Sequence, residues 1–193
     1  MRIWLIRHGL TREGAERRYQ GALDSPLCPE GKAALRRAQF SPDEVFVSPL
    51  LRARQTAEIL FPEAPLREIP DLREMDFGRF EGRSAKEMEQ DEAYNTWVDG
   101  NCLGRCPGGE DRASFSARVC GAFASLLQES DRCERKELVI VAHGGTQMSL
   151  LETYGSPERE YYLWQTACGN GWLLETRSGS GRLHVVREVS FTT

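Results

Sequence analysis

The chain has 193 residues, of which 40% are hydrophobic and 28% charged, and its net charge at neutral pH is −4. This length fits one domain with a full hydrophobic core, in an ordinary soluble globular protein. The charge argues against nucleic acid as a partner, and no apolar stretch of roughly 20 residues predicts a membrane span. Because the first residues already have the pattern of a strand, there is no room for a signal peptide, and we expect a cytoplasmic protein.

Six cysteines are spread along the chain, and in that compartment we expect them to be reduced thiols. Only Cys102 and Cys106 lie close together, and neither a second pair nor a histidine accompanies them. A zinc site is therefore not expected, and the sequence indicates no other metal and no cofactor.

Two segments with the same pattern organise the chain. Residues 3–6 form a short apolar run that is followed by Arg7 and His8, and residues 138–142 form a second run that is followed by His143. Such runs are typical of strands buried on both faces of a parallel sheet. If the two strands are adjacent and parallel, both histidines lie at the carboxyl edge of the sheet, where open α/β sheets bind ligands.

A glycine follows each of these histidines. Gly9 is expected to turn the backbone sharply and to leave its N–H group open to a ligand. Gly144 and Gly145 begin a predicted helix that extends to about Tyr154, and its first N–H groups could hold an anion. The polar loop of residues 10–27 follows Gly9 and is interpreted as a binding loop, with a solvated basic turn as the alternative.

The rest of the chain alternates between helical and strand patterns. Helices are predicted over about 29–40, 50–60, 114–127 and 157–164, and strands over 43–47, 65–69, 171–176 and 182–189. Ser48 is predicted to cap the helix that follows it, and the last two strands to form a hairpin around Ser178-Gly-Ser-Gly181. This alternation predicts an α/β fold.

Residues 84–112 have the least regular pattern. A short helix is predicted over 85–92, and Tyr94, Trp97 and a Pro107-Gly-Gly turn follow it. Aromatic side chains beside such a turn suggest a lid over a site rather than a disordered linker.

The predicted site combines imidazoles, cations and a carboxylate. Arg52 and Arg54 occur early in a predicted helix, where the dipole disfavours cations, so one needs an anionic partner and the other is expected to face water. Clustered arginines fit a phosphate, and a histidine beside them stays neutral and can act as a nucleophile. A nearby carboxylic acid, with Glu74 and Asp76 as candidates, could protonate the leaving oxygen. Without a serine or cysteine elbow or a P-loop, this chemistry is metal-free phosphoryl transfer through a phosphohistidine.

Six motifs occur in a specific order over nearly the whole chain. They are Leu5-Ile-Arg-His-Gly9, Tyr19-Gln-Gly21 with Asp24-Ser-Pro-Leu27, Ser48-Pro-Leu-Leu-Arg-Ala-Arg-Gln-Thr-Ala57, Leu72-Arg-Glu-Met-Asp-Phe-Gly78 with Glu81-Gly82, Pro107-Gly-Gly-Glu110, and Val141-Ala-His-Gly-Gly145. In this order they resemble the histidine phosphatase superfamily, in its phosphoglycerate mutase-like branch. The resemblance implies a three-layer α/β/α sandwich with a mostly parallel central sheet, a closing hairpin and a lid at about 84–112, in a single domain over 1–193.

The resemblance also implies roles for individual residues. His8 is the phosphorylated nucleophile, Glu74 the proton donor, and His143 the residue that stabilises the transferring phosphoryl group. The phosphate-binding residues are predicted to be Arg7, Arg52, Gln20 and Gly144, with Arg52 rather than Arg54 at the motif position. Gly14 stands where many relatives carry an asparagine that helps to position the phosphate, which bears on efficiency or substrate choice.

The chain is shorter than the glycolytic phosphoglycerate mutases and looks more like alpha-ribazole phosphatase-type and broad-specificity phosphatases. Its middle segment, 87–111, contains one basic residue, Arg105, against seven acidic ones. Such a lid should repel a second anion and accept an uncharged, bulky leaving group, against which Tyr94 or Trp97 could stack. The predicted substrate is a small-molecule phosphomonoester, with alpha-ribazole phosphate as first candidate on resemblance.

Two other interpretations remain open. One is phosphoglycerate mutase-type transfer, in which the phosphoryl group returns to the product. The other is a weakly catalytic phospho-ligand-binding regulatory module, against which the nucleophile and the acid argue, because a binder needs neither. If Glu74 is not the acid, Asp76 or Glu81 takes its place.

Overall fold

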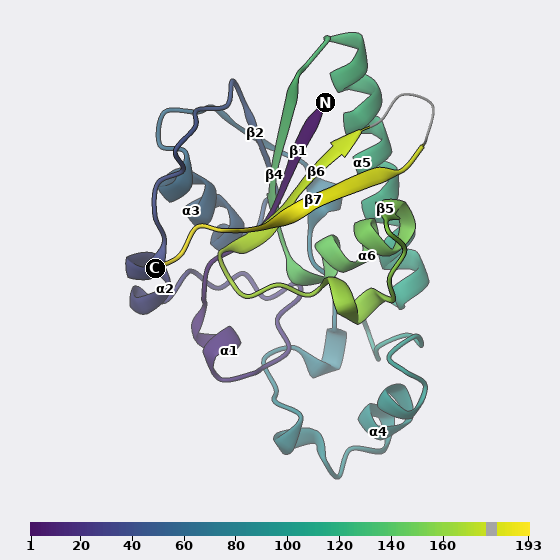
Figure 1. The fold of residues 1–193 in the computed structure, drawn as a ribbon. Helices are drawn as coiled ribbons and strands as arrows, with labels where there is room; N and C mark the ends of the chain where they lie inside the picture. The colour runs from purple at the N-terminus through teal and green to yellow at the C-terminus, as the bar shows by residue number, and fades with distance from the viewer. Residues whose placement is uncertain (177–180) are drawn as a thin grey trace.

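The computed structural model describes residues 1–176 and 181–193 (Figure 1). The strands are β1 (Arg2–Arg7), β2 (Val45–Val47), β3 (Leu66–Glu68), β4 (Glu137–Ala142), β5 (Gly155–Ser156), β6 (Asn170–Thr176) and β7 (Leu183–Ser190). The α-helices are α1 (Arg12–Ala15), α2 (Pro29–Ala34), α3 (Leu51–Leu60), α4 (Glu92–Asp99), α5 (Arg112–Arg132) and α6 (Gly144–Tyr154). Short 3₁₀ helices are η1 (Pro70–Leu72), η2 (Gly78–Phe80), η3 (Lys86–Met88) and η4 (Tyr161–Trp164).

The strands form one seven-stranded sheet in the order β3-β2-β4-β1-β6-β7-β5. From β3 to β1 all neighbours are parallel, whereas β6 runs antiparallel to both β1 and β7. β1 and β4 pair with Arg7 opposite Ala142, so the predicted adjacency of the two histidine strands is confirmed. The hairpin of β6 and β7 is also confirmed, while residues 178–180 of its predicted turn at 178–181 lie outside the described residues.

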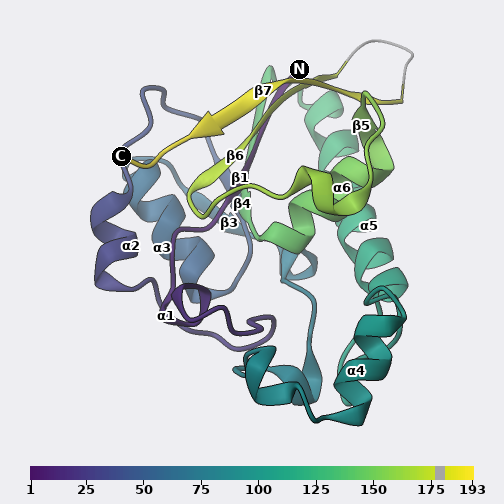
Figure 2. The same cartoon turned by 60° about the horizontal axis from the view of Figure 1, so that its bottom comes forward.

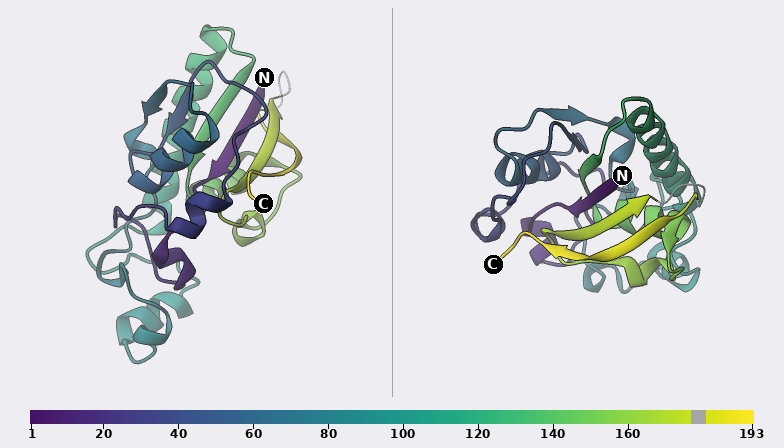
Figure 3. Two further views of the ribbon diagram at one scale, coloured as in Figure 1. Left: turned by 90° about the vertical axis from the view of Figure 1, so that its left-hand side faces the viewer. Right: turned by 45° about the horizontal axis from the view of Figure 1, so that its top comes forward.

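Helices cover both faces of the sheet (Figures 2 and 3). Alternate side chains of a strand point to opposite faces, which is why β1 is apolar without interruption. Ile3 and Leu5 pack in a cluster with residues of α5 and α6. Trp4 and Ile6 pack in a second cluster with residues of α3. The predicted three-layer α/β/α sandwich is therefore confirmed.

Two of the predicted helices are overridden by pairing with distant parts of the chain. α2 ends at Ala34 instead of about residue 40, because Leu35 is extended and pairs with Thr192 near the C-terminus. The predicted helix after Ser156 is replaced by a loop and η4, since Ser156 belongs to β5 and pairs with β7. In both places pairing with a distant strand or segment overrides the local helical pattern.

The middle segment extends beyond the carboxyl edge of the parallel strands, at the bottom of Figure 1. The predicted helix over 85–92 is wrong, because only η3 forms there and α4 begins where that helix was expected to end. Asp91 decides this start, since its carboxylate accepts hydrogen bonds from the N–H groups of Ala93 and Tyr94. No helix in the described parts of the chain is long and apolar enough to cross a membrane.

Candidate active site

The two histidines meet at the carboxyl edge of the sheet. His8 follows β1, His143 follows β4, and their ring centroids are 5.1 Å apart in an edge-to-face arrangement. The N–H of His8 donates to the carbonyl of Ala142 at 2.9 Å, which continues the pairing of the two strands. His8 is 7% exposed and His143 fully buried, so the predicted juxtaposition is confirmed in a site shielded from water.

The surroundings of His8 determine its tautomer. Its Nδ1 is 2.7 Å from the carbonyl oxygen of Gly9. Because a carbonyl only accepts, Nδ1 carries the proton and Nε2 carries the lone pair. Burial lowers the pKa of His8 well below its ordinary value, and the charges of Arg52 and Arg7 lower it further. At neutral pH the ring is therefore an uncharged imidazole whose Nε2 can act as a nucleophile.

The prediction that Gly9 leaves its N–H open to a ligand is wrong. This N–H donates to the hydroxyl of Thr56, on α3, at 2.9 Å. A side chain at Gly9 would start 3.0 Å from a methyl carbon of Leu35, so tight packing against neighbouring elements explains the glycine.

Ser48 fixes the second histidine. It follows β2, the neighbour of β4, and its hydroxyl is 2.7 Å from Nε2 of His143. The predicted capping role is wrong, because the hydroxyl accepts a hydrogen bond only from the N–H of Leu50, at 3.4 Å, and Leu50 precedes α3; the first N–H of the helix, that of Leu51, donates to Asp24 at 2.6 Å. Because the Ser48 hydroxyl accepts from the N–H of Leu50, its own proton is free to donate to Nε2, and the proton of His143 is assigned to Nδ1. That Nδ1 is buried and has no hydrogen-bond partner among the described residues.

Two arginines lie beside the histidines. The Arg7 guanidinium donates to the carbonyl of Thr166 at 2.5 Å, and the fully buried Arg52 donates to the carbonyls of Leu23 at 2.8 Å and Gly21 at 2.9 Å. In each guanidinium Nε is buried without a partner in the described part of the chain, which leaves a donor for an anion. Burial lowers the pKa of Arg52, and the charge of Glu74 opposes this shift.

Arg54 has the surface position expected for one arginine of α3. Its side chain is 40% exposed and pairs with Glu68 at 3.2 Å. The inward arginine is therefore Arg52, as the motif implied, although it is fully buried and is not among the residues that line the cavity. Its contact with a phosphate remains a prediction.

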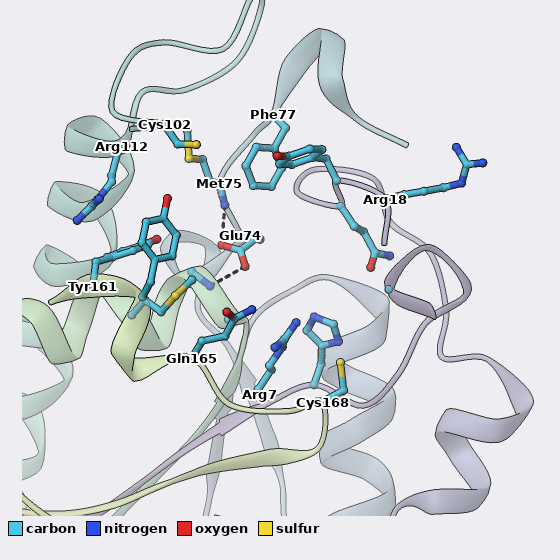
Figure 4. Close-up of a pocket in the computed structure, with 18 of the residues that line it drawn as sticks. Arg7, Arg18, Glu74, Met75, Phe77, Cys102, Arg112, Tyr161, Gln165 and Cys168 are labelled. Atoms are coloured by element: carbon cyan, nitrogen blue, oxygen red, sulfur yellow. Dashed lines mark hydrogen bonds between the residues drawn. The ribbon is translucent and has the colours of Figure 1, made fainter. Parts of the chain in front are cut away.

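Glu74 is held by the start of α6. Its Oε2 accepts a hydrogen bond from the N–H of Gly145 at 2.9 Å, and its Oε1 accepts one from the N–H of Met75 at 3.0 Å (Figure 4). Burial raises the pKa of Glu74 even though these hydrogen bonds favour the anion. A buried carboxyl with a raised pKa is suited to donate a proton, and one of the helix-start amides expected to bind an external anion is used by this side chain.

The alternative acids have other partners. Asp76 accepts from the N–H of Gly78 at 2.8 Å. Glu81 accepts from the N–H groups of Gly21 and Ala22, in the loop whose carbonyls hold Arg52. Because neither carboxylate lines the cavity, the geometry favours Glu74 over both.

A cavity of about 430 Å³ opens in front of these groups (Figure 4). Of the residues predicted for the site, those that line it are Arg7, His8, Gln20, Glu74 and Gly144. Gly14 lines it as well, so the position of the missing asparagine faces the cavity. The amide oxygen of Gln20 accepts from the Thr11 hydroxyl at 2.7 Å, which restrains this side chain.

The outer part of the cavity is aromatic. Tyr19, Phe77 and Trp97 contribute from the loop and the middle segment, and Tyr161 and Tyr162 from η4. Of the two predicted lid aromatics, Trp97 lines the cavity, whereas Tyr94 lies behind it and its hydroxyl is 3.0 Å from that of Tyr19.

The sequence interpretation missed several lining residues. They are Met75, Cys102, Arg112, Met148, Tyr161, Tyr162, Gln165 and Cys168, whereas Arg18 and Gly145 belong to the predicted binding loop and helix start. The sequence predicted only a helix up to about Trp164 here, and this local pattern does not reveal that residues 161–168 return to the cavity. The two arginines are paired: Arg18 contacts Glu87 at 2.6 Å, and Arg112 contacts Glu152 at 2.7 Å.

Neither the thiols nor the carboxylates form a metal centre in the described residues. No group of three or more histidine, cysteine, aspartate or glutamate side chains in them could hold a metal ion. Cys106 is buried, Cys102 lines the cavity, and all six cysteines are free.

The three-layer sandwich, with two histidines at the ends of neighbouring parallel strands and two arginines beside them, defines an α/β protein with a candidate anion site at the edge of its sheet. The family model described as histidine phosphatase superfamily (branch 1) matches residues 3–188, and the chain belongs to this family.

Similar proteins carry two kinds of name. The chain is 33% identical over 202 residues to a probable phosphoglycerate mutase GpmB of Escherichia fergusonii, covering 91% of this chain and 92% of the relative. It is 35% identical over 162 residues to an adenosylcobalamin/alpha-ribazole phosphatase of Salmonella typhimurium, covering 78% and 77%. The crystal structure of the alpha-ribazole phosphatase from Shigella flexneri superposes with a TM-score of 0.77 at 27% identity, covering 98% and 96%. Family and relatives together support an enzyme.

Proposed function

We propose that the protein is a metal-independent phosphomonoester hydrolase that acts through a phosphohistidine on His8. The observation that carries this proposal is the hydrogen bond from His8 Nδ1 to the Gly9 carbonyl, because it directs the lone pair of Nε2 away from the backbone. Since His8 lines the cavity together with Arg7 and Glu74, a nucleophile, a cation and an acid border the same space.

In the first step Nε2 of His8 attacks the phosphorus atom, and the bond from phosphorus to the ester oxygen breaks. The leaving oxygen takes the proton of the Glu74 carboxyl and departs as an alcohol. Arg7, Arg52 and the Nδ1–H of His143 neutralise the phosphoryl oxygens, a task for which their buried, unpartnered nitrogens are suited.

In the second step water attacks the phosphohistidine. The Glu74 carboxylate accepts a proton from that water as its oxygen bonds to phosphorus. The bond from phosphorus to Nε2 then breaks, phosphate leaves, and His8 and Glu74 return to their starting states. No metal is required, because the two guanidinium groups supply the positive charge.

The outer cavity supports a bulky leaving group without a second negative charge. Its walls are aromatic, and the cations at its rim are already paired, Arg18 with Glu87 and Arg112 with Glu152. The guanidinium of Arg112 also lies 3.8 Å from the centroid of the Tyr161 ring, so it presents a flat stacked surface. A nucleoside-like alcohol suits such walls. Alpha-ribazole phosphate is the first candidate substrate, because similar proteins are named alpha-ribazole phosphatases.

The reaction is tested by trapping the intermediate. Brief incubation with ³²P-labelled substrate and acid-free quenching should yield a labelled protein whose adduct is labile in acid and stable in base, as a phosphoramidate is. His8→Ala should lose the label and at least about 99% of the rate, because an essential nucleophile is removed. A folded His8→Ala protein with a higher residual rate would contradict the proposal.

Mutase activity is the second candidate, favoured by the similarity to a probable phosphoglycerate mutase. One assay separates the two. The protein is incubated with 3-phosphoglycerate and a trace of 2,3-bisphosphoglycerate, and in parallel with nucleoside-like monophosphates. We expect free phosphate from the monophosphates; rapid formation of 2-phosphoglycerate with little free phosphate from either mixture would reverse the assignment.

A further inference from the structure

A buried amide side chain on α6 is connected to the end of β1. Gln147 is fully buried, and its Nε2 donates to the carbonyl of Leu5 at 2.8 Å. Its Oε1 accepts a hydrogen bond from the hydroxyl of Thr166, also at 2.8 Å. Since the Leu5 carbonyl can only accept, the orientation of the amide is determined, and both of its ends are engaged.

Thr166 passes this restraint on to Arg7. Its side chain is held by Gln147, and its main-chain carbonyl accepts the hydrogen bond from Nη1 of Arg7. Three residues later the N–H of Gly169 donates to the carbonyl of His8 at 3.0 Å. The segment 166–169 is thus tied to Arg7 on one side and to His8 on the other.

The guanidinium of Arg7 is confined on a second side by the start of α6. A Cβ atom at Gly144 would lie 3.3 Å from both Cζ and Nε of Arg7, so the helix backbone packs closely against the guanidinium. With Nη1 committed to Thr166, the plane of the guanidinium has little freedom. Because the plane is fixed, the N–H of Nε, which has no partner among the described residues, points in one defined direction.

We propose that Gln147 and Thr166 are positioning residues that orient the Arg7 guanidinium for the phosphoryl group. The inference rests on the proposed function, in which Arg7 holds that group. A planar guanidinium binds phosphate well only when its donors point at two oxygens, and an error of about 1 Å in placement can slow a reaction roughly 100-fold. A fully buried amide that anchors the segment limits such errors.

The test uses two substitutions of different severity. Thr166→Val keeps the shape of the side chain and removes the donor to Gln147, while Gln147→Leu removes every hydrogen bond of the amide, to Thr166, to Leu5 and the longer one to Asn170. Each should raise KM for p-nitrophenyl phosphate and weaken the binding of inorganic phosphate by about tenfold, within the range of couplings between residues of one network. If Gln147→Leu does not fold, Thr166→Val decides alone.

A double-mutant cycle distinguishes positioning from general damage. In an Arg7→Ala background, Thr166→Val should have no further effect on kcat/KM, because the group it orients is gone. Thr146→Val is the matched control: it is the buried neighbour on α6, and its hydroxyl reaches the carbonyl of Leu72 at 3.4 Å instead of Thr166. Its phosphate affinity should stay within about twofold of the original protein.

The inference would be overturned if Thr166→Val lowered kcat/KM equally with and without Arg7, or if it did not weaken phosphate binding in the otherwise unchanged protein. Either result would leave the proposed function intact. A native protein that forms no phosphohistidine and binds no phosphate would overturn the proposed function instead. The two failures are therefore distinguishable.

Discussion

Gly145→Ala tests the placement of the proposed acid with a single methyl group. A Cβ atom at this position would lie 2.3 Å from Oε1 of Glu74 and 3.2 Å from its Oε2. To restore ordinary van der Waals contact, the carboxyl group must move by about 1 Å. It is the far end of a flexible side chain, so it can move while the backbone of α6 stays in place.

This movement of the Glu74 carboxyl group should lower the activity of the Gly145→Ala protein while leaving its stability nearly unchanged. Alanine has a higher helix propensity than glycine, by up to about 1 kcal/mol, which offsets much of the loss of the hydrogen bond to Glu74. A misplacement of about 1 Å in a catalytic group can lower the rate roughly 100-fold. We therefore expect a melting temperature close to that of the original protein, with kcat for an alkyl phosphate reduced about 100-fold.

The leaving group provides the internal comparison. p-Nitrophenolate departs without protonation, so its ester should be slowed by Gly145→Ala much less than an alkyl phosphate. Gly121→Ala is the control, because it lies within α5 and a Cβ atom there meets nothing within 4 Å; it should keep full activity. A folded Gly145→Ala protein that hydrolyses alkyl phosphates at the original rate would refute the reasoning.

The other predictions concern single groups and conditions. Activity should fall towards high pH, because the raised pKa of Glu74 keeps its carboxyl protonated only up to that pKa; Glu74→Gln should abolish this limb of the pH–rate profile and slow alkyl esters most. Ser48→Ala should lower kcat about tenfold and destabilise the protein by about 1–3 kcal/mol in a urea titration, since Nε2 of His143 then stays buried without a partner. Activity should survive dialysis against EDTA, and loss restored by a divalent ion would contradict the arginine-based mechanism. Gly14→Asn should bring a donor to the cavity and tighten inorganic phosphate binding, measured by calorimetry, by about three- to tenfold.

The periodicity of the sequence determined the layers of the fold. Uninterrupted apolar runs at 3–6 and 138–142 occur only where both faces of a strand are covered, so the central pair of strands and the meeting of His8 and His143 could be predicted. Helix ends were predicted less well. α2 and the segment after Ser156 have helical composition, but pairing with residues far along the chain contributes more than local propensity.

The site divides in the same way. Arg7, His8 and His143 follow directly from strand ends, and the order of the motifs pointed to Arg52 and Glu74. Gln147 and Thr166, whose hydrogen bonds connect α6 and the segment before β6 to β1, could not be recognised from any local sequence pattern.

Only the tertiary structure decided which group each candidate catalytic side chain contacts. Ser48 has the sequence context of a helix cap, yet its hydroxyl belongs to His143, because β2 and β4 are neighbours in the sheet. Glu81 was a candidate acid from its place in the motif, but its carboxylate accepts a hydrogen bond from the N–H of Gly21, whose carbonyl in turn accepts one from Arg52. Hydrogen bonds between residues roughly 60 to 140 positions apart depend on how layers pack, and short-range periodicity carries no information about that packing.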